Sequence, residues 1–135
     1  MIAINTLEAM AYRVFRFATT PIMYCPMIDA RRMEVFTMLI DEQFQVIKET
    51  VPVILEEYAF EDVLATNKVA FFGDGSAKTK GVIQHENACF IDAVFPSAEE
   101  VAMLALKKYE AKEFEHIVSF EPFYLKEFRL AKPKK

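Results

Sequence analysis

The sequence predicts an α/β domain in which an antiparallel three-strand meander extends into a mixed sheet with packed helices. Three short runs rich in β-branched and aromatic residues follow one another with brief turns, as antiparallel pairing permits. Two further apolar runs alternate downstream with helical patterns, which is typical of helices packed on a sheet. Hydrophobic residues make up 53% of the 135 residues, enough for the core of one domain spanning residues 1–135.

The first predicted element is a helix over Thr6–Phe17. Asn5 followed by Glu8 resembles a capping box, in which the Asn5 side chain accepts a hydrogen bond from a free backbone N–H. Pro21 prevents the helix from continuing. Apolar residues recur at spacings of three and four, at Leu7, Met10, Ala11, Val14 and Ala18.

Three strands are predicted next, over residues 22–28, 35–40 and 44–51. A turn at residues 41–42 joins the second strand to the third, and Pro52 marks a break.

Residues 54–65 are predicted to be helical, because Leu55, Tyr58, Ala59 and Val63 have helical spacing. Val69–Phe72 is predicted to be a strand that leaves through a glycine-containing loop.

Another strand is predicted within residues 88–95, followed by a last helix that Pro96 and Ser97 open. Ser97 and Glu100 form a second capping box. The predicted buried stripe of this helix consists of Val101, Leu104, Ala105 and Tyr109.

Charge and cysteine content narrow the function classes. Sixteen Lys and Arg against 20 Asp and Glu give a net charge of −4, which argues against direct binding of nucleic acid. Cys25 and Cys89 lie far apart and are interpreted as small buried residues in a reducing compartment. The uncharged run over residues 17–28 is too short to span a bilayer, and the N-terminus lacks the pattern of a secretory signal. We therefore expect a cytoplasmic protein without membrane contact.

The loop Gly73-Asp74-Gly75 is a candidate phosphate-binding site. A Walker A motif ending at Lys78-Thr79 would need glycine where Ala77 and Phe72 stand. A strand-to-helix turn is therefore the favoured interpretation. Gly73, Asp74 and Gly75 remain the cofactor-binding candidates, although we expect no cofactor.

Metal and nucleophile chemistry have little support in the sequence. His85 and His116 belong to no zinc-binding pattern and are expected at the surface, and no metal ligand is assigned. Neither cysteine has a basic helper nearby in the sequence, and no catalytic residue is assigned.

The polar stretch around Asp29, Arg31 and Glu34 lies between two buried strands. We interpret it as a hairpin turn in which Arg31 pairs with Asp29 or Glu34; the alternative is a carboxylate pair that holds a cation or orients a substrate. Residues 129–135 are expected to form a flexible basic tail.

Three segments resemble the TsaB (YeaZ) family. Residues 26–36 (PMIDARRMEVF) resemble its DARxxEVY/F segment, and residues 120–126 (FEPFYLK) resemble its closing PxYLR segment. Residues 3–10 (AINTLEAM) resemble its helix start of the form STLxAM, and the spacing of the three segments suits the family. Within these motifs we assign structural roles to Asp29, Arg31, Glu34, Pro122, Tyr124 and Leu125.

The resemblance implies an RNase H-like lobe of the actin-like ATPase superfamily. It also implies a non-enzymatic scaffold, described earlier as an inactive M22-like glycoprotease homologue or chaperone. Its implied partners are a TsaD-type protein and a TsaE-type ATPase, which together place threonylcarbamoyl on adenosine in tRNA.

The chain departs from the family pattern at its start. The family's LAIDTS strand and GPGSFTG segment are absent before Thr6–Phe17, so the chain resembles the C-terminal lobe alone. In the family, the principal TsaD contact is attributed to the first lobe. We therefore expect the isolated lobe to form a homo-oligomer that covers its apolar surface. Two alternatives remain open: a residual ATPase or phosphotransferase using the Gly73–Gly75 loop, and a stand-alone homodimerisation module.

Overall fold

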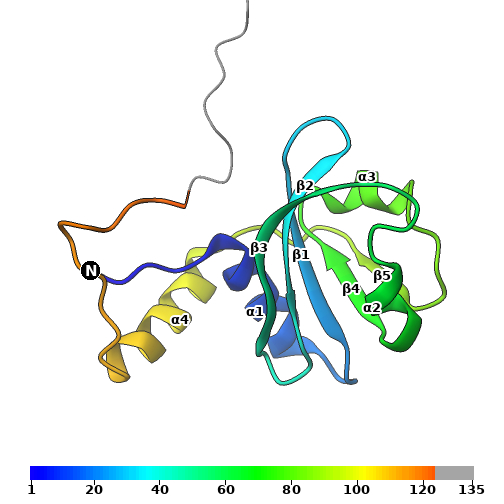
Figure 1. Cartoon of the computed structure of the whole chain (residues 1–135). Helices are drawn as coiled ribbons and strands as arrows, with labels where there is room; N and C mark the ends of the chain where they lie inside the picture. The colour runs from blue at the N-terminus through cyan, green and yellow to red at the C-terminus, as the bar shows by residue number, and fades with distance from the viewer. Residues whose placement is uncertain (124–135) are drawn as a thin grey trace, which may run out of the picture.

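The computed structural model describes residues 1–123 and has a five-stranded mixed sheet at its centre, in the order β3-β2-β1-β4-β5 (Figure 1). β1 pairs antiparallel with β2, and β2 pairs antiparallel with β3, whereas β4 is parallel to both β1 and β5. The strands are β1 (Met23–Asp29), β2 (Glu34–Ile40), β3 (Val46–Ile54), β4 (Val69–Phe72) and β5 (Ala88–Ile91). The predicted α/β class, with a meander extended into a mixed sheet, is confirmed.

Helices cover both faces of this sheet. They are α1 (Thr6–Phe17), α2 (Glu61–Thr66), α3 (Ser76–Lys80) and α4 (Ala98–Glu110). One core lies between the sheet and α1, where Leu7 and Met10 pack with Tyr24 and Phe72. A second core lies on the opposite face. Because both faces are covered, neighbouring β1 residues enter opposite cores, and the strand is apolar throughout instead of alternating.

The helix α1 begins and ends where the sequence predicts. The Asn5 side chain accepts a hydrogen bond from the Leu7 N–H at 2.9 Å, so the predicted cap is present. The Asn5 amide also donates to Thr50 Oγ1 at 2.9 Å, which ties the helix start to β3.

The structure corrects the prediction of a break at Pro52. β3 continues through this residue to Ile54, and Pro52 stands opposite Phe36 in the ladder. β3 has a neighbour on one side only. Proline is tolerated in such an edge strand, because its missing N–H need not serve a second neighbour.

The helix predicted over residues 54–65 is much shorter in the structure. Only Glu61–Thr66 is helical, because β3 occupies the start of the predicted range and turns follow it. Leu55 N donates to Met33 O at 2.7 Å and holds the chain against the β1–β2 connection. The strand predicted over residues 88–95 is likewise shorter and ends at Ile91.

The cap of α4 is confirmed, but its buried stripe is only partly correct. Ser97 Oγ accepts from Glu99 N at 3.2 Å. Leu104 is buried as predicted, whereas Val101 and Tyr109 are exposed. Glu100 takes a buried position instead: its Oε1 lies 3.0 Å from Arg16 Nη1 and 3.5 Å from Arg13 Nη1. α4 therefore contacts α1 partly through charge, which hydrophobic spacing does not reveal.

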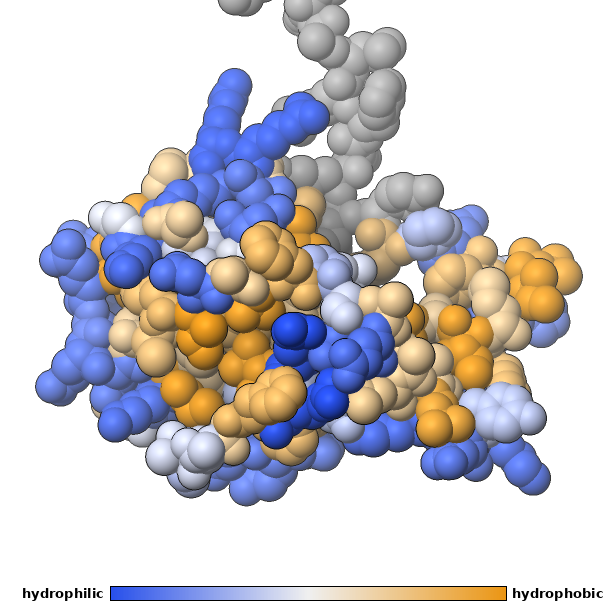
Figure 2. Space-filling model, turned by 180° about the vertical axis from the view of Figure 1, so that it is seen from behind, coloured by the Kyte–Doolittle hydropathy of each residue, from blue (hydrophilic) through white to orange (hydrophobic). Residues whose placement is uncertain are grey.

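Viewed from behind, the molecule shows apolar surface interrupted by a strongly hydrophilic patch (Figure 2). Large exposed apolar side chains lie on α4 and after it, among them Val101, Leu106, Tyr109, Phe114, Ile117 and Val118. No helix among residues 1–123 is long and apolar enough to cross a membrane.

Candidate functional site

The carboxyl ends of β1 and β4 lie side by side, because the two strands are parallel neighbours. From this point the chain leaves β1 toward β2 on one side and leaves β4 toward β5 on the other. Open α/β sheets usually bind ligands at such a divergence. Asp29 ends β1, and Gly73-Asp74-Gly75 follows β4, so the fold brings two sequence-predicted candidates together.

Lys78, on α3, joins these two segments. Its Nζ donates to Asp29 Oδ1 at 2.6 Å, to Arg32 O at 2.8 Å and to Glu34 O at 2.6 Å. An ammonium group has three N–H donors, and these three bonds use all of them. We call this arrangement the Lys78 clasp. Sequence reasoning considered Lys78 only as part of a Walker A motif and did not identify this role.

Asp29 and Asp74 both accept hydrogen bonds from backbone N–H groups at the end of β1 and in the β1–β2 connection. Asp29 Oδ1 also accepts from Arg31 N at 2.8 Å, and Asp74 Oδ1 accepts from Asp29 N at 2.7 Å. The hydrogen bond from Lys78, assisted by the one from Arg31 N, lowers the pKa of the Asp29 carboxyl below its ordinary value. The Asp29 carboxyl is therefore ionised at neutral pH, and its negative charge balances the positive charge of Lys78.

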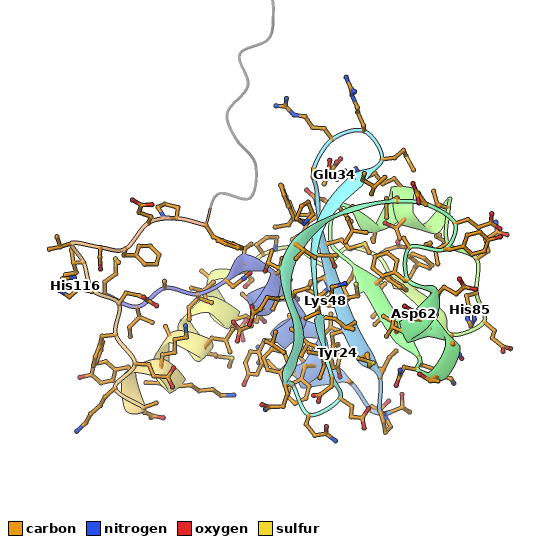
Figure 3. All side chains as sticks on the ribbon, in the orientation of Figure 1. Tyr24, Glu34, Lys48, Asp62, His85 and His116 are labelled. Atoms are coloured by element: carbon orange, nitrogen blue, oxygen red, sulfur yellow. The ribbon has the colours of Figure 1, made fainter. Side chains whose placement is uncertain are left out.

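The prediction that the Arg31 side chain pairs with Asp29 or Glu34 is wrong: among the described residues Arg31 forms an ion pair with neither, and Lys78 takes the position beside Asp29. Arg31 contributes its backbone N–H instead. Glu34, labelled in Figure 3, begins β2 and supplies a carbonyl oxygen to the clasp.

Close packing against β1 and β2 explains both glycines of the loop. Gly73 has φ +99°, and a Cβ there would lie 2.1 Å from Met27 O. At Gly75 a Cβ would lie 2.8 Å from Val35 Cγ1. The loop joins β4 to the five-residue helix α3 and lies directly on the backbone of β1.

The remaining candidates lie elsewhere in the chain. Pro122 is exposed, and Tyr124 and Leu125 lie outside the described residues, as does the basic tail. His85 and His116 are exposed, as predicted. Between Met1 and Phe123 there is no group of three His, Cys, Asp or Glu side chains placed to hold a metal ion.

The two cysteines have different environments. Cys25 is buried, as predicted, and its sulfur lies 3.1 Å from Thr37 Oγ1. Burial raises the pKa of its thiol to about 12, so this sulfur is a poor nucleophile. Cys89 is exposed on the edge strand β5, which corrects the prediction that both are buried.

A hollow in the described surface lies at the opposite end of β1 from the Lys78 clasp. Its volume is about 430 Å³, and it is lined by Phe15, Ala18, Thr19, Thr20, Pro21, Tyr24, Glu42 and Gln43. None of these residues belongs to the motifs singled out in the sequence.

Comparisons with known proteins place the fold. No family model and no curated protein matches the sequence. A solved structure of an uncharacterized protein with similarity to peptidase YeaZ from Pseudomonas aeruginosa superposes with a TM-score of 0.75 and 20% identity, covering 93% of this chain and 58% of that one. YeaZ from Pseudomonas aeruginosa gives a TM-score of 0.70 and 23% identity, covering 92% of this chain and 58% of that one.

These similarities show that the chain has the actin-like, RNase H-like fold of the YeaZ structures, which confirms the predicted fold class. The chain spans a little over half the length of both structures, at 58%.

Proposed function

We propose that this chain is a TsaB (YeaZ)-like lobe that acts as a non-catalytic scaffold in tRNA threonylcarbamoylation, with TsaD-type and TsaE-type proteins as partners. The observation that carries the proposal is the similarity to YeaZ structures over 93% and 92% of the chain. The resemblance of residues 29–35 to the DARxxEV segment of the family is a second observation in its favour. In the structure the aspartate of this segment and the backbone carbonyl of its glutamate accept hydrogen bonds from Lys78.

The chemistry at the divergence of the sheet supports a scaffold role. Every donor of the Lys78 ammonium is used within the protein, and Asp29 and Asp74 accept hydrogen bonds from the chain itself. A ligand that used the Lys78 ammonium would have to break these bonds before it could bind. The Lys78 clasp therefore has a structural role: it links β1, β2 and α3.

The charge balance supports binding to proteins more than to tRNA. A net charge of −4 disfavours broad contact with an RNA backbone, whose binding depends on cationic side chains that displace counterions. Exposed apolar side chains on α4, such as Leu106 and Tyr109, offer surface for protein contact or self-association. A cytoplasmic location follows from this role.

The test is reconstitution with the TsaD-type and TsaE-type proteins of the same organism. Binding of the full chain to each protein is measured by light scattering, and threonylcarbamoyladenosine in tRNA is quantified by mass spectrometry. We expect the chain to bind the TsaD-type protein and to raise the yield of modified tRNA. Absence of both effects would overturn the proposal.

The same samples test the two alternatives. A rise in melting temperature with millimolar ATP and Mg²⁺ would favour the nucleotide-binding lobe, because a ligand that binds the folded state stabilises it. A stable dimer that ignores the TsaD-type protein would favour the homodimerisation module.

A further inference from the structure

The connection between β1 and β2, residues 30–33, extends beyond the rest of the sheet (Figure 1). It contains two adjacent arginines, Arg31 and Arg32. We infer that this connection, which we call the arginine turn, is a docking point for an acidic patch on a protein partner. The inference rests on the proposed function and deepens it, because it assigns a partner-binding surface to the scaffold.

The backbone of the arginine turn is strained. Arg31 has φ 71° and Arg32 has φ 49°, both in the left-handed region. Glycine and asparagine are the residues that usually occupy this region in hairpin turns, because a longer side chain is disfavoured there. Strained residues of this kind concentrate at functional sites, where the surrounding structure holds them.

The Lys78 clasp supplies that support. Lys78 Nζ binds Arg32 O and Glu34 O, and Asp29 Oδ1 binds Arg31 N. The turn adds two backbone bonds of its own, from Ala30 N to Glu34 O at 3.0 Å and from Glu34 N to Arg31 O at 3.2 Å. The backbone under both arginines is therefore fixed before any partner arrives, which lowers the entropic cost of binding.

The side chains of the turn are available to a partner. Arg31 and Arg32 are exposed, and neither guanidinium forms an ion pair with another residue of the described part of the chain. Met33, next to them, is 43% exposed. Arg16 of α1 behaves differently: its side chain is only partly exposed and pairs with two glutamates, Glu99 and Glu100.

This combination fits a protein surface better than an RNA backbone. Arginine and methionine are enriched in protein interfaces, and a guanidinium binds a carboxylate through two parallel hydrogen bonds. An RNA backbone would require a broader basic face, whereas Asp29 and Asp74 lie at the base of this turn. The fitting partner carries Asp or Glu side chains around a small apolar contact for Met33.

The experiment measures the affinity of the full chain for the TsaD-type and TsaE-type proteins by calorimetry at low and moderate salt. The variant R31E/R32E reverses the charge of the turn, and K68E/K112E makes the same change of charge at two exposed lysines elsewhere. We expect R31E/R32E to weaken binding to one partner at least about tenfold, with a smaller salt dependence, and K68E/K112E to leave it within about twofold.

A second variant separates binding from folding. Asparagine tolerates the left-handed backbone, so R31N/R32N should melt at the wild-type temperature or higher and still bind more weakly.

The outcomes are distinguishable. Wild-type binding that R31E/R32E leaves unchanged would overturn this inference and leave the proposed function standing. A chain that binds neither protein would overturn both. The same calorimetry with tRNA tests the other class of partner: wild-type binding to tRNA that R31E/R32E abolishes, with protein binding unchanged, would identify the turn as a nucleic-acid contact and overturn the assignment to an acidic protein surface.

Discussion

Lys78 Nζ lies 2.6 Å from Asp29 Oδ1 although 49 positions separate the two residues in the sequence. Asp29 ends β1, and Lys78 belongs to the short helix that follows β4. The pair therefore fastens α3 to the β1–β2 connection. Through two further bonds to carbonyl oxygens, the same ammonium holds a turn whose backbone would otherwise be unfavourable.

Replacing Lys78 with methionine should destabilise the protein. The variant keeps much of the aliphatic length but removes charge-assisted bonds to Arg32 O and Glu34 O, which we expect to lower the free energy of unfolding by about 1–3 kcal/mol. Urea denaturation measures the change. Lys80→Met on the same helix is the matched control, because Lys80 is exposed. Equal midpoints for the two variants would contradict the clasp.

The ion pair should also give the stability a specific dependence on pH. Bonds from Lys78 and from Arg31 N lower the pKa of Asp29 in the folded state. A group with a lowered folded pKa stabilises the fold above its ordinary pKa, near about pH 4, and loses that contribution as the pH falls through the folded value.

The measurement compares thermal unfolding of wild type and Asp29→Asn between about pH 7 and pH 2.5. Wild type should be the more stable protein at neutral pH, and the difference should shrink below about pH 4. A difference that stays constant throughout this range would show that ionisation of Asp29 contributes nothing.

Gly73 should not tolerate a side chain. Gly73→Ala would place a Cβ 2.1 Å from Met27 O at a φ of +99°, and we expect a loss of about 3 kcal/mol or more in unfolding free energy. Gly81→Ala is the control, because a Cβ at Gly81 would lie 3.4 Å from Lys78 O, an ordinary contact distance, and the φ of Gly81 is −70°. Calorimetric melting of both variants decides the point, and a Gly73→Ala protein as stable as Gly81→Ala would refute the packing argument.

The two thiols should differ in reactivity. Cys89 is exposed, whereas Cys25 is buried and has a pKa raised to about 12. In the folded protein at pH 8, a disulfide reagent should label Cys89 alone, and both should react in denaturant. Cys89→Ser should abolish labelling of the folded protein. Rapid labelling of that variant would show that the core around Cys25 opens readily.

Much of the fold could be predicted from the sequence, because local signals and the core pattern agree over several elements. Thr6–Phe17 has a cap, a periodic apolar face and a terminating proline nearby, and its predicted bounds match the structure. Val69–Phe72 is a compact apolar run with glycine after it, and its bounds also match. Two predictions were wrong where the position in the sheet outweighed a local signal. Pro52 does not end β3, because β3 is an edge strand that can accept a proline. Cys89 is exposed and not buried, because β5 is the other edge strand.

The candidate site could be predicted only in part. Asp29 and the Gly73–Gly75 loop stood out as polar or glycine-rich positions beside apolar runs, and both lie where the sheet diverges. The partner of Asp29 could not be found in this way, because an ion pair between residues 49 positions apart leaves no periodic signal. Arg31 is nearer in the sequence, but the left-handed backbone places its N–H, and not its guanidinium, on the Asp29 carboxylate.

By itself, the sequence determined the α/β class, the first helix, the meander and the apolar runs of the sheet, because these depend on neighbouring residues and on periodic burial. The tertiary structure decided which charges meet. Lys78 reaches Asp29 because parallel pairing of β1 with β4 brings α3 beside the β1–β2 connection, and Glu100 is buried because α4 packs on α1. Such contacts depend on the order of the strands and the packing of the helices, which follow from the whole chain and not from any one segment of it.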